Sequence, residues 1–261
     1  ALGPMSAGDI ARLDKKYRLR LQTLQAVDEL VGHLVEVLRQ TGQLDKTYIV
    51  FTSDNGFHLG QHRMNQGKQT AYEEDIHVPL VMRGPGIPAG HVVPDLAVEV
   101  DLAPTFAAWA GAPTPAYVDG RVLTPLLKAK LTVPHQWREG VFIEHHPGNE
   151  PFLSRFERKI ITNARLPAYT AVRSRNYLYV EYERGERELY DVRNDIDELN
   201  NIYRTAAPAL LKQLSEWLQR MKTCAAAGCR AAEEMPTLET SPGATINHVS
   251  TNQAKSARVP G

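Results

Sequence analysis

The 261-residue chain has little of several features that would assign a protein to a class at once. Its 30 lysines and arginines balance 30 aspartates and glutamates, so no net charge attracts it to nucleic acid or to an anionic membrane. No apolar run approaches the roughly 20 residues that span a bilayer. Residues 1–5 contain neither an opening methionine nor the basic and apolar segments of a signal peptide, so we expect a processed or partial chain.

Cysteine is also scarce, with only Cys224 and Cys229 in the whole chain. The two residues are close enough in sequence to close a small disulfide loop if the protein is exported, and free thiols are the alternative. A metal site needs more ligands than this pair offers, and none lie nearby. Apart from these scarcities the composition is ordinary for a soluble globular protein, with 43% hydrophobic and 23% charged residues.

The most informative stretch is an apolar run over residues 48–53 that stops abruptly at polar residues. Asp54 and Asn55 follow at once, then Gly56, which allows a sharp turn. This pattern is typical of a buried parallel strand that delivers polar groups to its carboxyl end, where ligands bind in open α/β sheets. Asp54 and Asn55 would supply hard oxygen ligands, and Lys68 a point charge for an oxyanion. A turn rich in local hydrogen bonds is the simpler alternative.

The pattern around this stretch predicts an α/β fold. Apolar residues at helical spacing occupy 9–40, strands are expected at 48–53 and 78–82, and a short helix is expected at 70–75. A strand, a crossover and a second strand at this spacing suggest a βαβ unit, and hence a mainly parallel sheet flanked by helices. Residues 92–100 could add a further strand.

A helix should follow from Asp101, as its N-cap, to Ala110. The second half of the chain changes character. After a short strand at 141–143, aromatic and β-branched residues predict an antiparallel meander of three strands, and an amphipathic helix should pack on it. The meander strands and the helix are expected at residues 169–174, 177–182, 188–191 and 208–222.

Taken together and in order, several short motifs resemble the sulfatase branch of the alkaline phosphatase superfamily, in the style of arylsulfatases and N-acetylglucosamine-6-sulfatases. The resemblance runs from about Ala11 to Cys229. The motifs are Thr-Ser-Asp-Asn-Gly (52–56), His-Leu-Gly-Gln (58–61), Gly-Lys (67–68), Val-Pro-Leu (78–80) and Arg-Gly-Pro-Gly (83–86).

The resemblance implies a calcium-dependent hydrolase of sulfate esters that uses a formylglycine nucleophile. Asp54 and Asn55 would be ligands of the one divalent cation, and Lys68 would hold the sulfate and stabilise the charge that develops on it. His58 would touch the substrate or the leaving group. His62 and His145 are weaker candidates for substrate binding, since each could equally brace its own loop or strand. The family also suggests an exported protein, in the periplasm, outside the cell or in a lysosome.

The sequence departs from the family in two respects that matter for activity. The modification signature, a Cys or Ser followed at intervals by Pro or Ala and then Arg, does not occur, and the paired aspartates that complete the metal site are also missing. The chain therefore resembles the C-terminal half of a sulfatase, and alone it should not turn over substrate. We expect residues 1–134 to be part of the α/β core, 135–232 to form a small antiparallel subdomain with a helix, and 233–261 to be a poorly ordered tail.

Two other functions stay open. A phosphonate or phosphodiester hydrolase of the same superfamily tends to carry histidine where Asn55 stands, so Asn55 favours sulfate and calcium. A non-catalytic chain, serving as a binding or structural module, would fit the missing nucleophile. The expected partner is a small-molecule or carbohydrate sulfate ester, with no nucleic acid.

Overall fold

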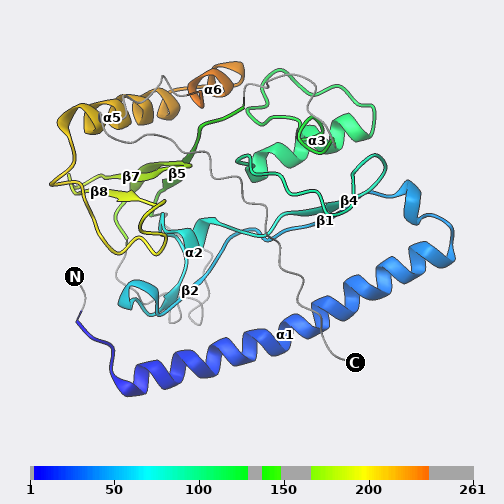
Figure 1. Ribbon diagram of the computed structural model, residues 1–261, viewed down its shortest axis with the longest axis horizontal. Coiled ribbons are helices and arrows are strands. Elements are labelled where there is room, and N and C mark those ends of the chain that lie inside the picture. The colour runs from blue at the N-terminus through cyan, green and yellow to red at the C-terminus, as the bar shows by residue number, and fades with distance from the viewer. Residues whose placement is uncertain (1–2, 129–136, 148–165, 235–261) are drawn as a thin grey trace.

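The computed structural model describes residues 3–128, 137–147 and 166–234 (Figure 1). A long helix lies along one edge, and a small sheet with two covering helices lies at the other. Short strands and loops that carry the polar motif residues connect the two parts. Most of the expected tail falls on residues 235–261, which lie outside the described residues, as do residues 129–136 around the expected domain boundary.

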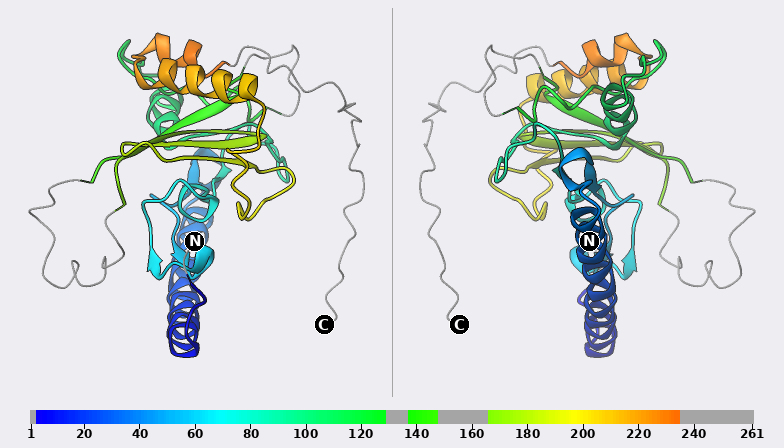
Figure 2. Two further views of the ribbon diagram at one scale, coloured as in Figure 1. Left: turned by 90° about the vertical axis from the view of Figure 1, so that its left-hand side faces the viewer. Right: turned by 90° about the vertical axis from the view of Figure 1, so that its right-hand side faces the viewer.

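Helix α1 (Ala7–Gln40) is one uninterrupted helix of 34 residues. Ser6 caps it, since its hydroxyl accepts a hydrogen bond from the backbone N–H of Asp9. Of the residues in this helix only Leu13 is buried, and α1 projects away from the sheet (Figure 2). An exposed apolar surface of this kind is typical of an interaction site. Its large apolar side chains that are at least 40% exposed are Ile10, Tyr17, Leu19, Leu21, Leu24, Val27, Leu30, Leu34 and Val37.

No helix in the part of the chain that the structure describes has both the length and the apolarity to cross a membrane.

The strand before Asp54 is antiparallel to its neighbour, so the predicted βαβ unit is wrong for this pair. Strand β1 (Ile49–Phe51) pairs with β4 (Val81–Arg83), with Ile49 opposite Arg83 and Phe51 opposite Val81. Two parallel neighbours need a crossover that carries the chain back along the strand. Helix α2 (Glu73–Ile76) is a single turn and provides no such crossover.

The β1–β4 pair is also less buried than a central strand would be. The side chains of Phe51 and Val81 are 39% and 61% exposed. The apolar run was therefore correctly identified as a strand, but it forms a short two-stranded ribbon among the described residues rather than the interior of a parallel sheet.

A second ribbon follows β1 in the chain. Strand β2 (His58–Leu59) pairs with β3 (Gln66–Gly67) across a single-turn 3₁₀ helix, η2 (Gln61–Arg63). His62 and Arg63 in this turn have left-handed backbone φ angles of 52° and 59°. Such values are uncommon outside glycine, so the surrounding contacts must hold this turn.

The predicted strand at 92–100 is not observed. That stretch is irregular and ends in a 3₁₀ turn, η3 (Glu99–Asp101), before α3 (Leu102–Trp109). The Asp101 side chain does not cap α3. It accepts hydrogen bonds from the N–H groups of Val98 and Arg121 and forms a buried ion pair with Arg138. The Arg138 guanidinium is buried and requires a carboxylate partner, so Asp101 pairs with it instead of capping α3.

The predicted antiparallel meander is confirmed, and the observed sheet contains one strand more than the three predicted. Its order is β5 (Gly140–His145), β6 (Tyr169–Ser174), β7 (Tyr177–Tyr182) and β8 (Arg187–Asp191), with every neighbouring pair antiparallel. The expected short strand at 141–143 is the centre of β5. It belongs to this sheet because its whole length pairs with β6.

The amphipathic helix predicted at 208–222 is confirmed as α5 (Pro208–Lys222), and it covers one face of the sheet (Figure 2). Trp217 at its centre is fully buried. A Cβ atom at Gly140 would lie 2.3 Å from the Trp217 ring, so only glycine lets β5 approach the helix this closely. The buried side chains of this interface are Val172, Tyr179, Leu189, Leu214, Trp217, Leu218 and Met221.

The opposite face of the sheet packs against the loop that carries the motif residues. Ala71 and Tyr72 from that loop contact a cluster formed by Tyr169, Ala171, Leu178, Val180, Tyr190 and Val192. The Glu188 carboxylate lies at this face, where it accepts hydrogen bonds from the hydroxyls of Tyr72 (3.2 Å) and Tyr182 (3.3 Å). Burial outweighs these bonds and raises the pKa of Glu188 above its ordinary value of 4.5.

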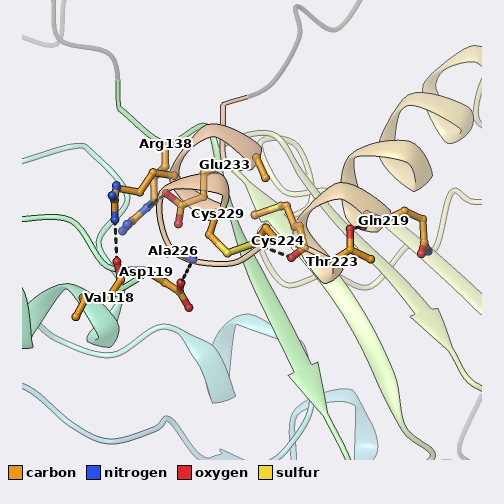
Figure 3. Close-up of a disulfide and its surroundings, with 12 residues drawn as sticks. Val118, Asp119, Arg138, Gln219, Thr223, Cys224, Ala226, Cys229 and Glu233 are labelled. Carbon is orange, nitrogen blue, oxygen red and sulfur yellow. Dashed lines mark hydrogen bonds and ion pairs between the residues drawn. A yellow bond between two sulfur atoms is a disulfide. The ribbon is translucent and has the colours of Figure 1, made fainter. Parts of the chain in front are cut away.

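Cys224 and Cys229 form the expected disulfide, which joins the end of α5 to α6 (Ala227–Ala232) (Figure 3). The Asp119 carboxylate accepts a 2.5 Å hydrogen bond from the Ala226 N–H inside this loop, and Arg230 donates to the Val118 carbonyl at 2.8 Å. The disulfide loop therefore also anchors the segment that follows α3.

Replacing both cysteines with serine should lower the free energy of unfolding by about 2 kcal/mol, because opening so short a loop restores little chain entropy to the unfolded state. Urea denaturation of the double variant beside the unmodified chain measures the difference. Two titratable thiols in the unreduced native protein would refute the disulfide.

The raised pKa of Glu188 predicts how stability depends on pH. Below 4.5 the carboxyl is protonated in both states; above 4.5 the unfolded chain releases the proton while the folded chain keeps it. The stability that Glu188 contributes is thus complete below 4.5 and is lost as pH rises through its raised pKa. Glu188→Gln should remove this loss, so the free energy of unfolding of the unmodified chain, measured from pH 4 to 8, should fall relative to that of the variant. Parallel curves would contradict the assignment.

Candidate functional site

The structure brings together Asn55 and Lys68, two of the residues that the sequence selects. The Lys68 ammonium donates a 2.9 Å hydrogen bond to Asn55 Oδ1. Both residues line one cavity of about 1750 Å³ together with Asp54, Asp75 and His145. The cavity thus has a cation, an amide and carboxylates along its wall, which suits an anionic ligand bound beside a metal.

The turn after β1 explains why a glycine follows Asp54 and Asn55. The Gly56 N–H donates to the Asp75 carbonyl at 2.9 Å, and the Phe57 N–H donates to the Glu74 carbonyl at 2.7 Å. A Cβ atom at Gly56 would lie 1.9 Å from that Glu74 oxygen. Only glycine allows this approach, which fixes the Asp-Asn-Gly turn against α2.

His58 is clasped by Asp75, a residue that the sequence analysis did not select. The two oxygens of Asp75 lie 3.0 and 2.9 Å from His58 Nδ1. The same carboxylate also accepts hydrogen bonds from the His58 backbone N–H at 3.0 Å and from the Thr70 N–H and hydroxyl at 2.9 and 2.6 Å. A carboxylate that only accepts requires Nδ1 to carry the proton, which leaves Nε2 of a neutral ring as an acceptor.

The clasp places His58 in the interior. Its side chain is 3% exposed and does not line the cavity of Asn55 and Lys68, and its Nε2 has no hydrogen-bond partner in the described part of the chain. In this structure His58 braces the loop between β2 and α2, and its contact with substrate stays a prediction. Asp75 was overlooked because it stands in the run Glu73–Asp75, which resembles the acidic first turn of a helix.

His62 likewise points away from the cavity. Its ring stacks on Tyr72 with centroids 4.0 Å apart, and its Nε2 lies 3.8 Å from a carboxylate oxygen of Glu74. Burial lowers the pKa of His62, although the nearby Glu74 works in the opposite direction. His62 therefore belongs to a separate group of side chains, together with Glu74 and Glu198.

His145 lines the cavity from strand β5, far from Lys68 in sequence. It ends β5 opposite Tyr169 of β6, and the two rings are tilted with centroids 5.6 Å apart. Its neighbour His146 is exposed and lies 3.2 Å from a carboxylate oxygen of Glu144. The structure thus places His145 with Asn55 and Lys68, and His58 and His62 apart from them.

The small sheet holds the site loop at several points that the sequence does not reveal. The Tyr169 hydroxyl donates a 2.9 Å hydrogen bond to the Gln69 carbonyl, and Gln69 itself has a left-handed φ of 89°. Arg173 forms a 3.0 Å ion pair with Glu73, whose backbone N–H donates to Glu198 at 2.9 Å. These contacts fix the backbone on both sides of α2 and immediately after Lys68.

Comparison with known proteins identifies the family to which the sequence is similar. The family model named Sulfatase matches residues 5–112, and the model named N-sulphoglucosamine sulphohydrolase, C-terminal, matches residues 60–224. N-acetylglucosamine-6-sulfatase from Homo sapiens is 35% identical over 246 residues, which cover 87% of this chain and 44% of that protein. The chain therefore spans less than half the length of this relative.

Two solved structures are similar in fold. One is a protein in complex with its substrate D-glucosamine-2-N,6-O-disulfate, with a TM-score of 0.67, 31% identity, and coverage of 77% of this chain and 39% of that one. The other is the phosphonate monoester hydrolase from Silicibacter pomeroyi, with a TM-score of 0.61, 31% identity, and coverage of 75% and 38%.

The second family model covers well over half of the chain, and its match includes Lys68, Asp75 and the whole antiparallel sheet. The chain belongs to the sulfatase family of the alkaline phosphatase superfamily.

Proposed function

We propose that this chain carries the sulfate-binding half of an enzyme that hydrolyses sulfate esters of carbohydrates. The observation that carries the proposal is the 2.9 Å hydrogen bond between Lys68 and Asn55, beside Asp54 and at the wall of a large cavity. The sequence has no Cys or Ser in the modification pattern. On this proposal the formylglycine nucleophile is carried by a polypeptide segment outside these residues, and the chain alone should be inactive.

Lys68 is suited to hold a sulfate because of where its ammonium group is placed. An ammonium has three N–H donors, and Asn55 accepts one of them. The side chain is otherwise exposed towards the cavity, so it can donate to sulfate oxygens. A fixed positive charge there stabilises the negative charge that grows on the ester oxygens in the transition state.

Asp54 and Asn55 fit a calcium ion by their chemistry. A carboxylate and an amide oxygen are hard donors of the kind that Ca²⁺ prefers, and Ca²⁺ takes six to eight of them. The two residues would supply part of that set, and the family's paired aspartates the rest. When bound, the ion supplies positive charge beside the sulfate and the nucleophile. Lys68 keeps Asn55 Oδ1 oriented towards the same wall of the cavity.

A sulfated sugar is the proposed substrate class. The similar structure solved with D-glucosamine-2-N,6-O-disulfate supports this class. In this chain His145 and Tyr169 line the same cavity as Lys68, so an imidazole and an aromatic ring are available to the sugar. The Cys224–Cys229 disulfide supports a protein that is exported to an oxidising compartment.

A phosphonate monoester hydrolase is the second candidate, because such an enzyme has a similar structure at the same identity. Asn55 is the residue that favours sulfate, since the resemblance places histidine at this position in the phosphonate enzymes. A non-catalytic binding module is the third, and it differs from both in predicting no turnover even when the N-terminal segment is supplied.

The central test is Lys68→Ala in a protein that joins this chain to a formylglycine-bearing N-terminal segment. Loss of a preorganised charge at the transition state should lower kcat/KM for 4-nitrophenyl sulfate by about 100- to 1000-fold. Lys212→Ala, an exposed lysine on α5, is the matched control and should leave the rate unchanged.

Activity that survives Lys68→Ala would refute the role of the lysine. The same assay with 4-nitrophenyl phenylphosphonate separates the two enzyme classes. A higher kcat/KM for the phosphonate ester would favour the phosphonate hydrolase, and no turnover of either ester would favour the binding module.

A further inference from the structure

Three side chains that do not line the proposed sulfate cavity lie close together. His62 comes from η2, Glu74 from α2, and Glu198 from the loop that follows β8. One ring nitrogen of His62 and one carboxylate oxygen from each glutamate all lie within 4.8 Å of one another. These atoms come from three separate segments, so their meeting is a result of the fold rather than of local sequence.

Two of the polar atoms in this group are buried without a hydrogen-bond partner among the described residues. Glu198 is 1% exposed; its Oε2 accepts a 2.9 Å hydrogen bond from the Glu73 N–H, whereas its Oε1 has no partner. His62 Nε2 is buried in the same way and lies 3.8 Å from Glu74 Oε2. Leaving such groups unpaired in the interior costs on the order of 1–3 kcal/mol each. A ligand that satisfied both atoms would remove this cost.

The electrostatic balance of the group favours a cation. Asp195 and Asp197 add negative charge around His62, and the positive charge that acts on Glu198 is that of Arg173, which pairs with Glu73. Burial raises the pKa of Glu198 to about 7, although Arg173 and the Glu73 N–H act in the opposite direction. Burial also lowers the pKa of His62, and the neutral imidazole is the form that coordinates metals.

We propose that His62, Glu74 and Glu198 form a site for a divalent transition-metal ion of the zinc type, separate from the calcium site. Zinc binds both histidine nitrogen and glutamate oxygen, and a water molecule would complete a tetrahedral set of four ligands. Zinc–ligand bonds of about 2.0–2.2 Å bring tetrahedral ligand atoms to roughly 3.4 Å from one another, so the side chains must close by on the order of 1 Å. An imidazole ligand also selects zinc over calcium.

The ion would have a structural function. It would join η2, α2 and the loop after β8, and so tie the small sheet to the loop that presents Lys68. The site does not depend on the proposed sulfatase activity, since none of its three residues lines the cavity of Asn55 and Lys68.

Isothermal titration of the metal-stripped, tag-free chain with zinc chloride at pH 7.5 tests the site. We expect one zinc ion per chain, and the Kd should weaken at least tenfold in His62→Gln and in Glu198→Gln. His77→Gln, an exposed histidine that also belongs to this region and pairs with Glu73, is the control and should bind as the unmodified chain does. Cobalt substitution adds a second readout, because visible absorption bands report nitrogen and oxygen ligands and should disappear in the same two variants.

If Glu198→Gln fails to fold, which circular dichroism would show, Glu74→Gln provides the test in its place. The Glu74 side chain is half-buried, and the glutamine amide that replaces its carboxylate keeps one oxygen, so the fold should persist while zinc affinity falls. No zinc binding by the folded chain at 100 µM metal, or binding that survives both His62→Gln and Glu74→Gln, would overturn the proposal. Binding lost in His145→Gln instead would equally overturn it.

Discussion

The Asp75 carboxylate is the interaction on which the site loop depends. It receives hydrogen bonds from the backbone of His58 and of Thr70, from the Thr70 hydroxyl and from the His58 ring, and all of these groups are buried. It joins β2, the segment after β3 and α2 into one unit. Asn55 precedes that unit and Lys68 lies within it, and their side chains are 2.9 Å apart.

The small antiparallel sheet supports the same unit from behind. Tyr169 and Arg173 of β6 reach the Gln69 carbonyl and the Glu73 carboxylate, and Glu198 binds the Glu73 backbone N–H. The sheet is in turn fixed by α5, whose Trp217 packs against Gly140. The C-terminal half of the chain thus acts as a rigid base for the loop that presents Lys68. In contrast, α1 exposes its apolar side chains and gains little from the rest of the described structure.

Some of this arrangement could be predicted from the sequence. The meander and α5 have strong periodic signals, and the strand before Asp54 was found because an apolar run ends there. Its direction could not be found, because a run of apolar residues is the same for either strand orientation. Asp75 and Glu198 were missed for a related reason. Both lie in acidic stretches, and their importance comes from burial beside residues that are distant in sequence, such as the 125 positions that separate Glu73 from Glu198.

Hydrogen exchange of the His58 and Thr70 backbone amides tests most directly whether Asp75 organises the loop. Both amides donate to that carboxylate, so Asp75→Ala should make them exchange much faster, while the Leu178 amide in the centre of the sheet keeps its rate as an internal reference. Such a result would show that the clasp, and not the sheet alone, orders the loop that presents Lys68. Equal protection of both amides in the variant and in the unmodified chain would contradict this account.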